Sequence, residues 1–165
     1  MGIQGALKID DIPGESKRAD HEDEIDFYGL HWEIQQQSSS AAGSGRSRGR
    51  ADVSGVTMWK AVDAASPYLA LASMQGKSLP ECTAYVRKDS GDAHLDYLKI
   101  TMTNCMISAV EFLNHDDSTD DVNDQIIHEK ITITCEKINV VYTVQADDHS
   151  AGDEHEVEYD IVKGA

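Results

Sequence analysis

Apolar and polar residues alternate along much of the chain, and a repeat of two is typical of β-strands with one buried face. The repeat is clearest in three stretches of the C-terminal third. Their apolar positions are Ile127, Ile131, Ile133 and Cys135, then Ile138, Val140, Tyr142 and Val144, and finally Val157, Tyr159 and Ile161. A shorter strand is expected over residues 7–12, where Pro13-Gly14 supplies a turn. The pattern predicts a mainly β fold.

Two longer strand-like stretches change parity midway. The apolar positions are Ile25 and Phe27 and then Tyr28, Leu30, Trp32 and Ile34 in the first, and Leu95 and Tyr97 and then Leu98, Ile100 and Met102 in the second. Such a switch predicts a β-bulge or a strand that crosses from one sheet to another. Strands that bend in this way close barrels and two-sheet sandwiches. Residues 88–92, Lys-Asp-Ser-Gly-Asp, have the composition of a hairpin turn.

One short helix is expected, because Ser66 can cap it, Pro67 fits its first turn and Gly76 suits the left-handed residue after its end. A rough apolar stripe along it consists of Tyr68, Leu69, Ala72 and Met74. A single helix among about eight strands favours a flanking element over a site. We therefore expect a compact β-barrel of two packed antiparallel sheets with one short flanking α-helix and a long protruding loop.

The protruding loop is expected at about residues 35–50, a low-complexity stretch rich in Gln, Ser, Gly and Arg. Such a composition cannot bury a core, and the stretch is too long for an ordinary hairpin connection. It carries Arg46, Arg48 and Arg50, a basic cluster on an acidic chain. The loop is either merely solvated, or it orders against an acidic partner such as another copy of the chain.

Length and charge restrict the possible partners. The 165 residues predict one domain, 1–165. A formal charge of −16 repels phosphate backbones, so nucleic acid is not expected as a partner. No stretch has the roughly 20 apolar residues of a membrane span, so membrane insertion is not expected. The first residues lack the pattern of a secretory signal peptide, so export is expected to use another route.

The residue patterns favour no catalytic site, cofactor or metal site, and hence no enzyme. The seven histidines are scattered, and Gly43-Ser44-Gly45 lacks the rest of a nucleotide-binding loop. Residues 116–124 hold several aspartates but lack the glycine and final glutamate of an EF-hand. Cys82, Cys105 and Cys135 lie in apolar, strand-like runs without a Cys-x-x-Cys spacing, so we expect buried free thiols.

Several segments follow one another in a recognisable order: Pro13-Gly14-Glu15-Ser16, His21, Glu24-Ile25, Trp32, the loop, the strand 53–60, Val62 to Leu69, Ala84 to Lys88 and Tyr97 to Ile100. Through these residues the chain resembles, over nearly its whole length, the haemolysin-coregulated (Hcp) proteins of the bacterial type VI secretion system. After Glu111 the match is mainly one of strand pattern, and this region is unusually acidic.

The resemblance implies a structural subunit of the type VI secretion tube. Hexameric rings of such subunits stack inside a contractile sheath, carry a spike at the tip and are secreted with it. The implied partners are further copies of the chain, the spike, the sheath and small effectors in the ring lumen. The alternative that it implies is a carrier or chaperone for those effectors.

The chain ends at Ala165, so no C-terminal toxin domain is expected. Assembly is expected in the bacterial cytoplasm, followed by delivery outside the cell or into target cells. A small enzyme or ligand-binding barrel is the third possibility, which a native mass measurement would separate from a ring. Given the stacked rings that the resemblance implies, we expect Arg46, Arg48 and Arg50 to contact an acidic patch of the adjacent ring, since arginine pairs well with carboxylates.

Overall fold

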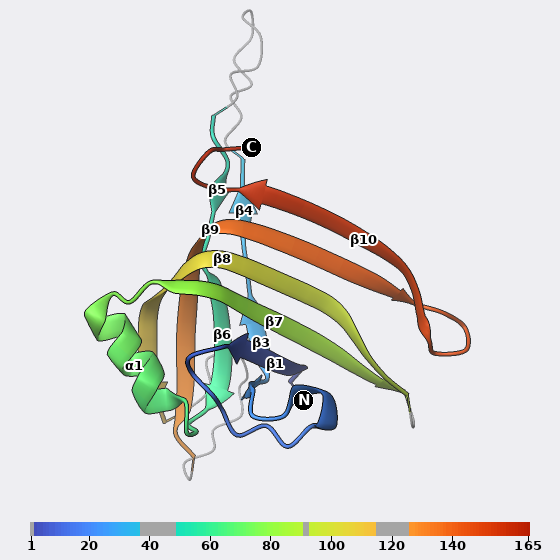
Figure 1. Ribbon diagram of the computed structural model, residues 1–165, viewed down its shortest axis with the longest axis horizontal. Coiled ribbons are helices and arrows are strands. Elements are labelled where there is room, and N and C mark those ends of the chain that lie inside the picture. Colours follow the sequence, from blue (N-terminus) through green and yellow to red (C-terminus); the bar gives the residue numbers. More distant parts are fainter. Residues whose placement is uncertain (1, 37–48, 91–92, 115–125) are drawn as a thin grey trace, which may run out of the picture.

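The computed structural model describes every residue except 1, 37–48, 91–92 and 115–125. Ten strands and one α-helix form most of the described chain (Figure 1). In chain order they are β1 (Gln4–Ile9), the 3-10 turn η1 (Ala19–His21), β2 (Ile25–Phe27), β3 (Gly29–His31), β4 (Ile34–Gln35), β5 (Asp52–Val53), β6 (Val56–Ala61), α1 (Ser66–Gln75), β7 (Leu79–Ser90), β8 (Ala93–Leu113), β9 (His128–Gln145) and β10 (Ala151–Asp160).

One antiparallel sheet makes the barrel. Its strand order is β2-β1-β7-β8-β9-β6-β3, with β10 added beside β9, while β4 and β5 form a separate two-stranded ribbon. The predicted mainly β barrel with one flanking helix is thus confirmed, and its two layers are parts of one strongly bent sheet. Long antiparallel strands that share a core on one face account for the period-two pattern.

The first parity switch closes this barrel. Strands β2 and β3 follow each other directly in the chain, yet β2 pairs with β1 and β3 pairs with β6, at opposite ends of the strand order. Tyr28 lies between them, donates its backbone N–H to the Trp59 carbonyl at 2.9 Å and accepts the N–H of Ile3 at 2.9 Å. The predicted crossing from one part of the sheet to another is therefore confirmed.

The second parity switch is a β-bulge. Val86 of β7 pairs with Leu98 of β8, but the next residue, Arg87, pairs with Asp96, which leaves Tyr97 without an opposite residue. An extra residue of this kind increases the local twist and bend of a strand. The predicted hairpin also forms, because Ser90 pairs with Ala93 across the turn between β7 and β8.

Strand β9 changes its neighbour halfway along. Its first part, up to Ile133, pairs with β6, whereas its second part, from Lys137 onwards, pairs with β10. Strand β8 accompanies it on the other side along most of its length. The sheet therefore forks at residues 134–136, and Figure 1 shows β7 to β10 sweeping away from the barrel as one curved layer.

The buried core follows the alternation in the middle of β9 and departs from it near the ends of β9 and on β10. Ile131, Ile133 and Ile138 are buried as expected. Ile127, which precedes β9, is exposed. Tyr142 and Val144 near the C-terminal end of β9 and Val157 on β10 are exposed as well. The expectation that these four residues are core positions is wrong for the isolated chain, because Ile127 lies before the start of β9 and no layer of the described chain covers the other three.

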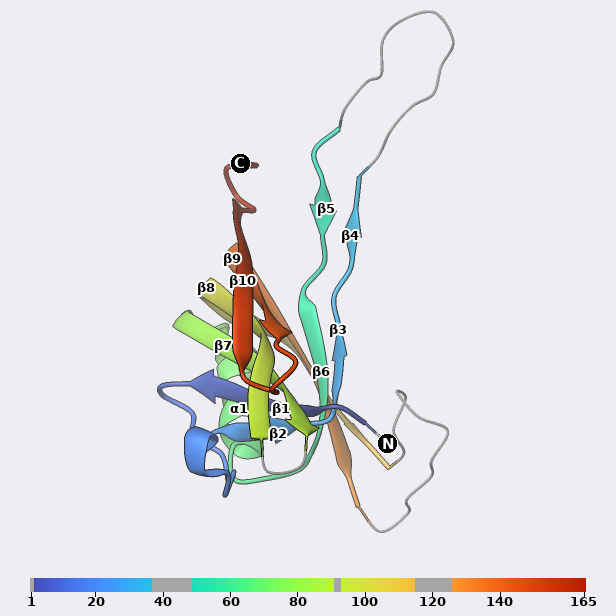
Figure 2. The same ribbon diagram turned by 90° about the vertical axis from the view of Figure 1, so that its right-hand side faces the viewer.

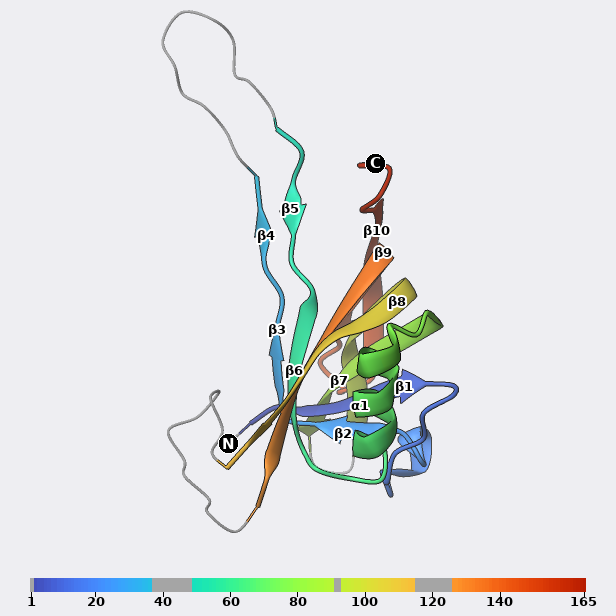
Figure 3. The ribbon, with the colours of Figure 1, turned by 90° about the vertical axis from the view of Figure 1, so that its left-hand side faces the viewer.

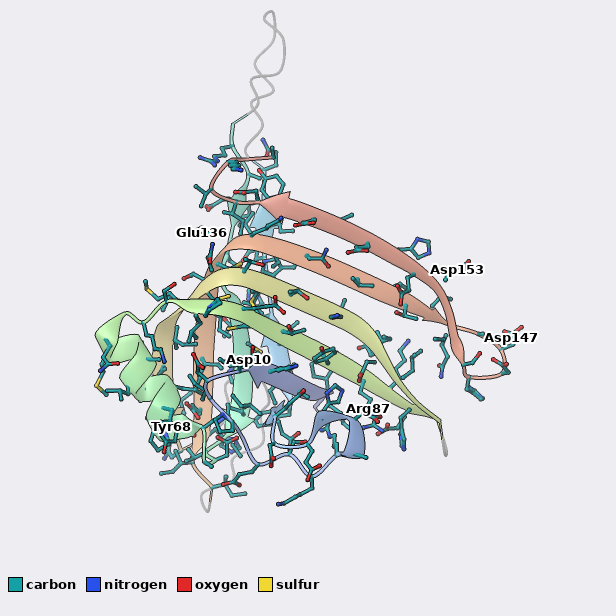
Figure 4. All side chains as sticks on the ribbon, in the orientation of Figure 1. Asp10, Tyr68, Arg87, Glu136, Asp147 and Asp153 are labelled. Atoms are coloured by element: carbon teal, nitrogen blue, oxygen red, sulfur yellow. The ribbon has the colours of Figure 1, made fainter. Side chains whose placement is uncertain are left out.

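Helix α1 packs against the barrel through Leu69 and Ala72, and Gly76 ends it in the left-handed conformation with φ +58°, as predicted. Tyr68 and Met74 are exposed, so their place in the apolar stripe is wrong, since the buried face repeats at other positions of the helix. Figure 4 labels Tyr68 on the outer side of α1.

The start of α1 is tied to the barrel by a buried ionic cluster. The prediction that Ser66 caps the helix is wrong: Ala65 is the N-cap residue, and the Ser66 hydroxyl donates a hydrogen bond to Glu129 of β9 at 2.6 Å. Lys60 of β6, which is fully buried, donates to Glu129 at 2.6 Å, to Asp63 at 2.9 Å and to Ser66 at 3.1 Å. A buried charge is tolerated only with such partners, so this cluster fixes the helix position on the two strands.

Candidate assembly surface

The fork in the sheet leaves the ribbon β4–β5 standing away from the barrel. The ribbon continues from β3 and β6, and the backbone N–H of Ser54 bonds to the carbonyl of Glu33 at 2.9 Å where it departs. Gly55 is needed just after it, because a Cβ there would lie 2.7 Å from the Thr132 methyl group. Figures 2 and 3 show the ribbon rising clear of the layer that contains β9 and β10.

An apolar groove lies between the ribbon and this layer. It has a volume of about 230 Å³. Its walls are Trp32, Ile34, Ala51 and Val53 on the side of the ribbon, and Ile138, Val140, Val157 and Tyr159 from β9 and β10. Val157 is 69% exposed and Ile34 is 55% exposed. Apolar side chains gathered at one site and left open to solvent mark an interaction surface more often than single exposed ones do.

Strand β10 forms the rim of the groove and is an edge strand. It pairs with β9 along one side, and no strand in the described part of the chain pairs with its other side. Residues 151–158 are exposed, so that both faces of the strand meet solvent in the isolated chain. Unpaired edges of this kind pair readily with another chain unless charge or a covering element prevents it.

The charges on β10 are mostly negative. Glu156 accepts a hydrogen bond from Asn139 at 2.7 Å, and Glu158 pairs with Lys137. Asp153 and Glu154 extend the acidic side chains toward the β9–β10 turn, where Asp147 lies (Figure 4). The acidic side chains of β10 therefore lie along the edge of the sheet.

Arg50 is the member of the arginine cluster that the structure describes. Its guanidinium donates to the backbone carbonyls of Ile161, at 2.8 Å, and Val162. These carbonyls belong to the turn after β10, so Arg50 ties the ribbon to the C-terminal end of the same chain. Arg46 and Arg48 lie outside the described residues, and so do the aspartates of residues 116–124.

Sequence reasoning missed a buried histidine with two acidic partners. His21 hydrogen-bonds through Nδ1 to Glu24 at 2.8 Å and through Nε2 to Asp96 at 2.7 Å. Its ring also lies 4.7 Å from that of Tyr85. The spacing of His21 and Glu24 was visible in the sequence, but Asp96 lies 75 positions away and only folding brings it near. These hydrogen bonds hold the segment before β2 against β8.

The three cysteines meet in the barrel wall. Cys82 and Cys105 are buried, as predicted, whereas Cys135 is only partly buried. A hydrogen bond from the Cys82 thiol lowers the pKa of the Cys105 thiol, and the same bond raises the pKa of Cys82. Burial raises the pKa of Cys135 to about 12.

Within the described residues, no group of three or more His, Cys, Asp or Glu side chains is arranged to hold a metal ion. The described helix is neither long nor apolar enough to cross a membrane.

Comparison with known proteins identifies the class of this barrel. The family model described as "Type VI secretion system effector, Hcp" matches residues 7–142. A curated relative, Protein hcp1 of Pseudomonas aeruginosa, is 29% identical over 110 residues, which make up 67% of this chain and 68% of the relative.

Solved structures agree over almost the full length. Hcp1 from Salmonella typhimurium is 28% identical with a TM-score of 0.77, and the match covers 99% of this chain and 97% of that one. The structure of a type six secretion system protein superposes with a TM-score of 0.87 at 21% identity, over 99% and 98% of the two chains, which is a likeness of fold. The chain belongs to the Hcp family of the type VI secretion system.

Proposed function

We propose that this chain is a structural subunit of the type VI secretion tube, in which six copies close a ring and rings stack inside a contractile sheath. The observation that carries the proposal is the edge strand β10, which is exposed on both faces beside an open apolar groove. In a monomer this apolar surface stays exposed to water, whereas a neighbouring copy would bury it. The chemistry proposed is assembly, with no catalytic role.

The ring contact must join two different surfaces. In a ring of six, each subunit meets its neighbours head to tail, and the rotation must close to avoid an open filament. One side of the contact is the free edge of β10 together with the groove behind it. Backbone pairing at the edge would supply direction, and burial of Val157 and Ile34 would supply the hydrophobic contribution.

The experiment is a measurement of native mass. Sedimentation of the wild-type protein at micromolar concentration should give a species of six chains. The variant Val157→Asp places a charge on the groove wall and should sediment mainly as a folded monomer. Val62→Asp is the matched control, because Val62 is an exposed valine outside the groove, and it should retain the ring. A wild-type protein that stays monomeric would overturn the proposal.

We assign the stacking of rings to Arg46, Arg48 and Arg50, because arginine pairs well with carboxylates and the chain is strongly acidic. Each copy carries −16, so ring faces repel one another over a Debye length of roughly 8 Å at physiological salt. Six arginine-bearing loops acting together would offset this repulsion through multivalency. Stacking should therefore need a spike-like partner, high concentration or added salt.

Because Arg50 also bonds to its own chain, the test separates it from the other two arginines. The variant Arg46→Ser/Arg48→Ser should keep its rings and lose long tubes in electron micrographs. Arg50→Ser alone removes the bonds between the ribbon and the turn after β10, so it should make the ribbon more mobile and the groove beside it less well defined. Normal tube formation by the double variant would leave the loop as a solvated linker.

The remaining partners follow from the same proposal. A tube of this kind is assembled in the bacterial cytoplasm, carries a spike at its tip and is secreted outside the cell or into a target cell. Small effectors in the ring lumen are its cargo, so a carrier role accompanies the structural one.

A further inference from the structure

Three cysteines from three adjacent strands come together in the barrel wall. Cys82 lies on β7, Cys105 on β8 and Cys135 on β9. Cys105 and Cys135 are directly opposite each other in the antiparallel register of β8 and β9. Strand β7, which carries Cys82, pairs with β8 on the other side, and the Cys82 thiol lowers the pKa of Cys105. Cys105 is thus the central thiol of the three.

The opposed pair has the backbone geometry of a cross-strand disulfide. Directly opposite residues in an antiparallel ladder have Cα atoms about 4.5–5.5 Å apart, and disulfides span Cα distances of about 4.4–6.8 Å. Cys105 is buried and Cys135 packs partly against the same core, so both side chains are on one face of the sheet. On the other face, Asn104 donates to Glu136 at 3.1 Å, which holds the two strands together at this point.

We propose that Cys105 and Cys135 are an oxidisable pair that closes to a disulfide across β8 and β9 when the protein meets a small-molecule disulfide, while Cys82 remains a thiol. The setting rests on the proposed function, because a delivered tube subunit moves from a reducing compartment to one where disulfides persist. The thiol chemistry itself belongs to the single chain and does not depend on ring formation.

The reaction proceeds by two exchanges. The Cys135 thiolate, on the more accessible residue, attacks one sulfur of the small disulfide; that S–S bond breaks and the leaving thiolate takes up a proton. The Cys105 thiolate then attacks the Cys135 sulfur of the mixed disulfide, and the second small thiolate leaves and is protonated. Two protein thiols are oxidised and one small disulfide is reduced to two thiols.

The different pKa values of Cys105 and Cys135 suit the two thiols to different steps. Cys105 is the stronger acid of the buried pair because Cys82 donates a hydrogen bond to it, which suits it to the second attack. Cys135, with its pKa raised to about 12, is mostly protonated at neutral pH. The first exchange is therefore the slow step, and the pair closes over a long exposure rather than during a brief one.

The experiment exposes the purified native protein to glutathione disulfide and counts free thiols after denaturation. The wild type should fall from three thiols to one, with an intact mass lower by about 2 Da for the two hydrogens lost. Peptide mapping should join the segments that contain Cys105 and Cys135. Three thiols remaining after long incubation, or a lasting glutathione adduct on Cys135, would overturn the proposal.

Single variants identify the pair. Cys82→Ala should still form the disulfide and end with no free thiol. Cys105→Ala and Cys135→Ala should form no internal disulfide, and circular dichroism should show that each keeps its β-sheet. An internal disulfide in Cys135→Ala would join Cys82 to Cys105 and refute the assignment.

The pH dependence tests the order of the steps. Closure governed by a thiol with a pKa of about 12 should accelerate about tenfold for each pH unit between about pH 7 and 10, because the thiolate fraction rises in that proportion. A thiol of ordinary pKa would level off above about pH 8.5. Levelling there would contradict attack by Cys135. A wild-type protein that stays monomeric and still closes the disulfide would overturn the ring proposal and leave this one standing.

Discussion

The two halves of strand β9 have the same strand geometry but opposite surroundings. The first half lies between β6 and β8, and its inward residues Ile131 and Ile133 are fully buried. The second half lies between β8 and β10, and its Tyr142 is 42% exposed. Each half also carries an ion pair. Glu129 is buried with Lys60, whereas Lys137 is exposed and paired with Glu158.

The difference separates residues that hold the chain together from residues that face a neighbour. Burial makes the loss of one partner costly in the first half, because the remaining group has no access to water. In the second half water replaces a lost partner readily. The first half should therefore govern the free energy of unfolding, and the second half should govern association between copies.

The largest effect is expected for Glu129→Ala. This change leaves Asp63 as the remaining carboxylate partner of the buried Lys60 and removes the closer acceptor of the Ser66 hydroxyl, so the free energy of unfolding should fall by about 3–5 kcal/mol. Urea titration followed by tryptophan fluorescence, at one fixed protein concentration, measures it. The concentration must be fixed because ring formation adds to apparent stability.

The control removes the charges of Lys60 and Glu129 together. Lys60→Met/Glu129→Leu should recover much of the lost stability, since apolar replacements for a buried ion pair are often neutral or stabilising. If Glu129→Ala costs less than about 1 kcal/mol, the cluster is hydrated in solution and the contrast between the two halves disappears.

A smaller effect is expected for Ile133→Val. This residue is fully buried in the first half of β9, and deletion of one methyl group from a core isoleucine costs about 0.5–1.5 kcal/mol. Val157 lies on β10, the strand that pairs with the second half of β9. Val157→Ala removes more carbon atoms than Ile133→Val does, but it should lower the free energy of unfolding of the monomer less. Equal effects from the two would show that β10 is covered within the single chain.

The sequence predicted the parts of the fold that depend on local pattern. The presence of the strands, the left-handed Gly76 and the two parity switches depend on neighbouring residues, and the structure confirms each of them. The exposure of Val157 was not predictable in this way. Its alternation is that of a core strand, and only the fork in the sheet shows that no described layer covers it.

The groups with distant partners were also missed. Lys60 reads as a solvated residue in a strand, because Glu129 lies 69 positions further along the chain. Arg50 was assigned to contacts between rings, whereas its described contacts are carbonyls of its own C-terminal turn. The pairing of Cys105 with Cys135 likewise depends on the register of β8 and β9, which periodicity alone does not set.

The smallest effect is expected for Glu158→Ala. Its ion pair with Lys137 is exposed, with the two side chains 48% and 45% accessible, and such pairs contribute about 0–1 kcal/mol. Loss of the carboxylate should change the urea midpoint of the monomeric Val157→Asp background by less than the scatter between preparations. In the ring-forming background the same change removes a charge from the β10 edge and should alter the salt dependence of sedimentation. Glu22→Ala, at an exposed acidic residue in the segment before β2 and not on β10, is the matched control and should leave that salt dependence unchanged. A large loss of monomer stability in Glu158→Ala would mean that the outer half of β9 supports the fold as much as the inner half does.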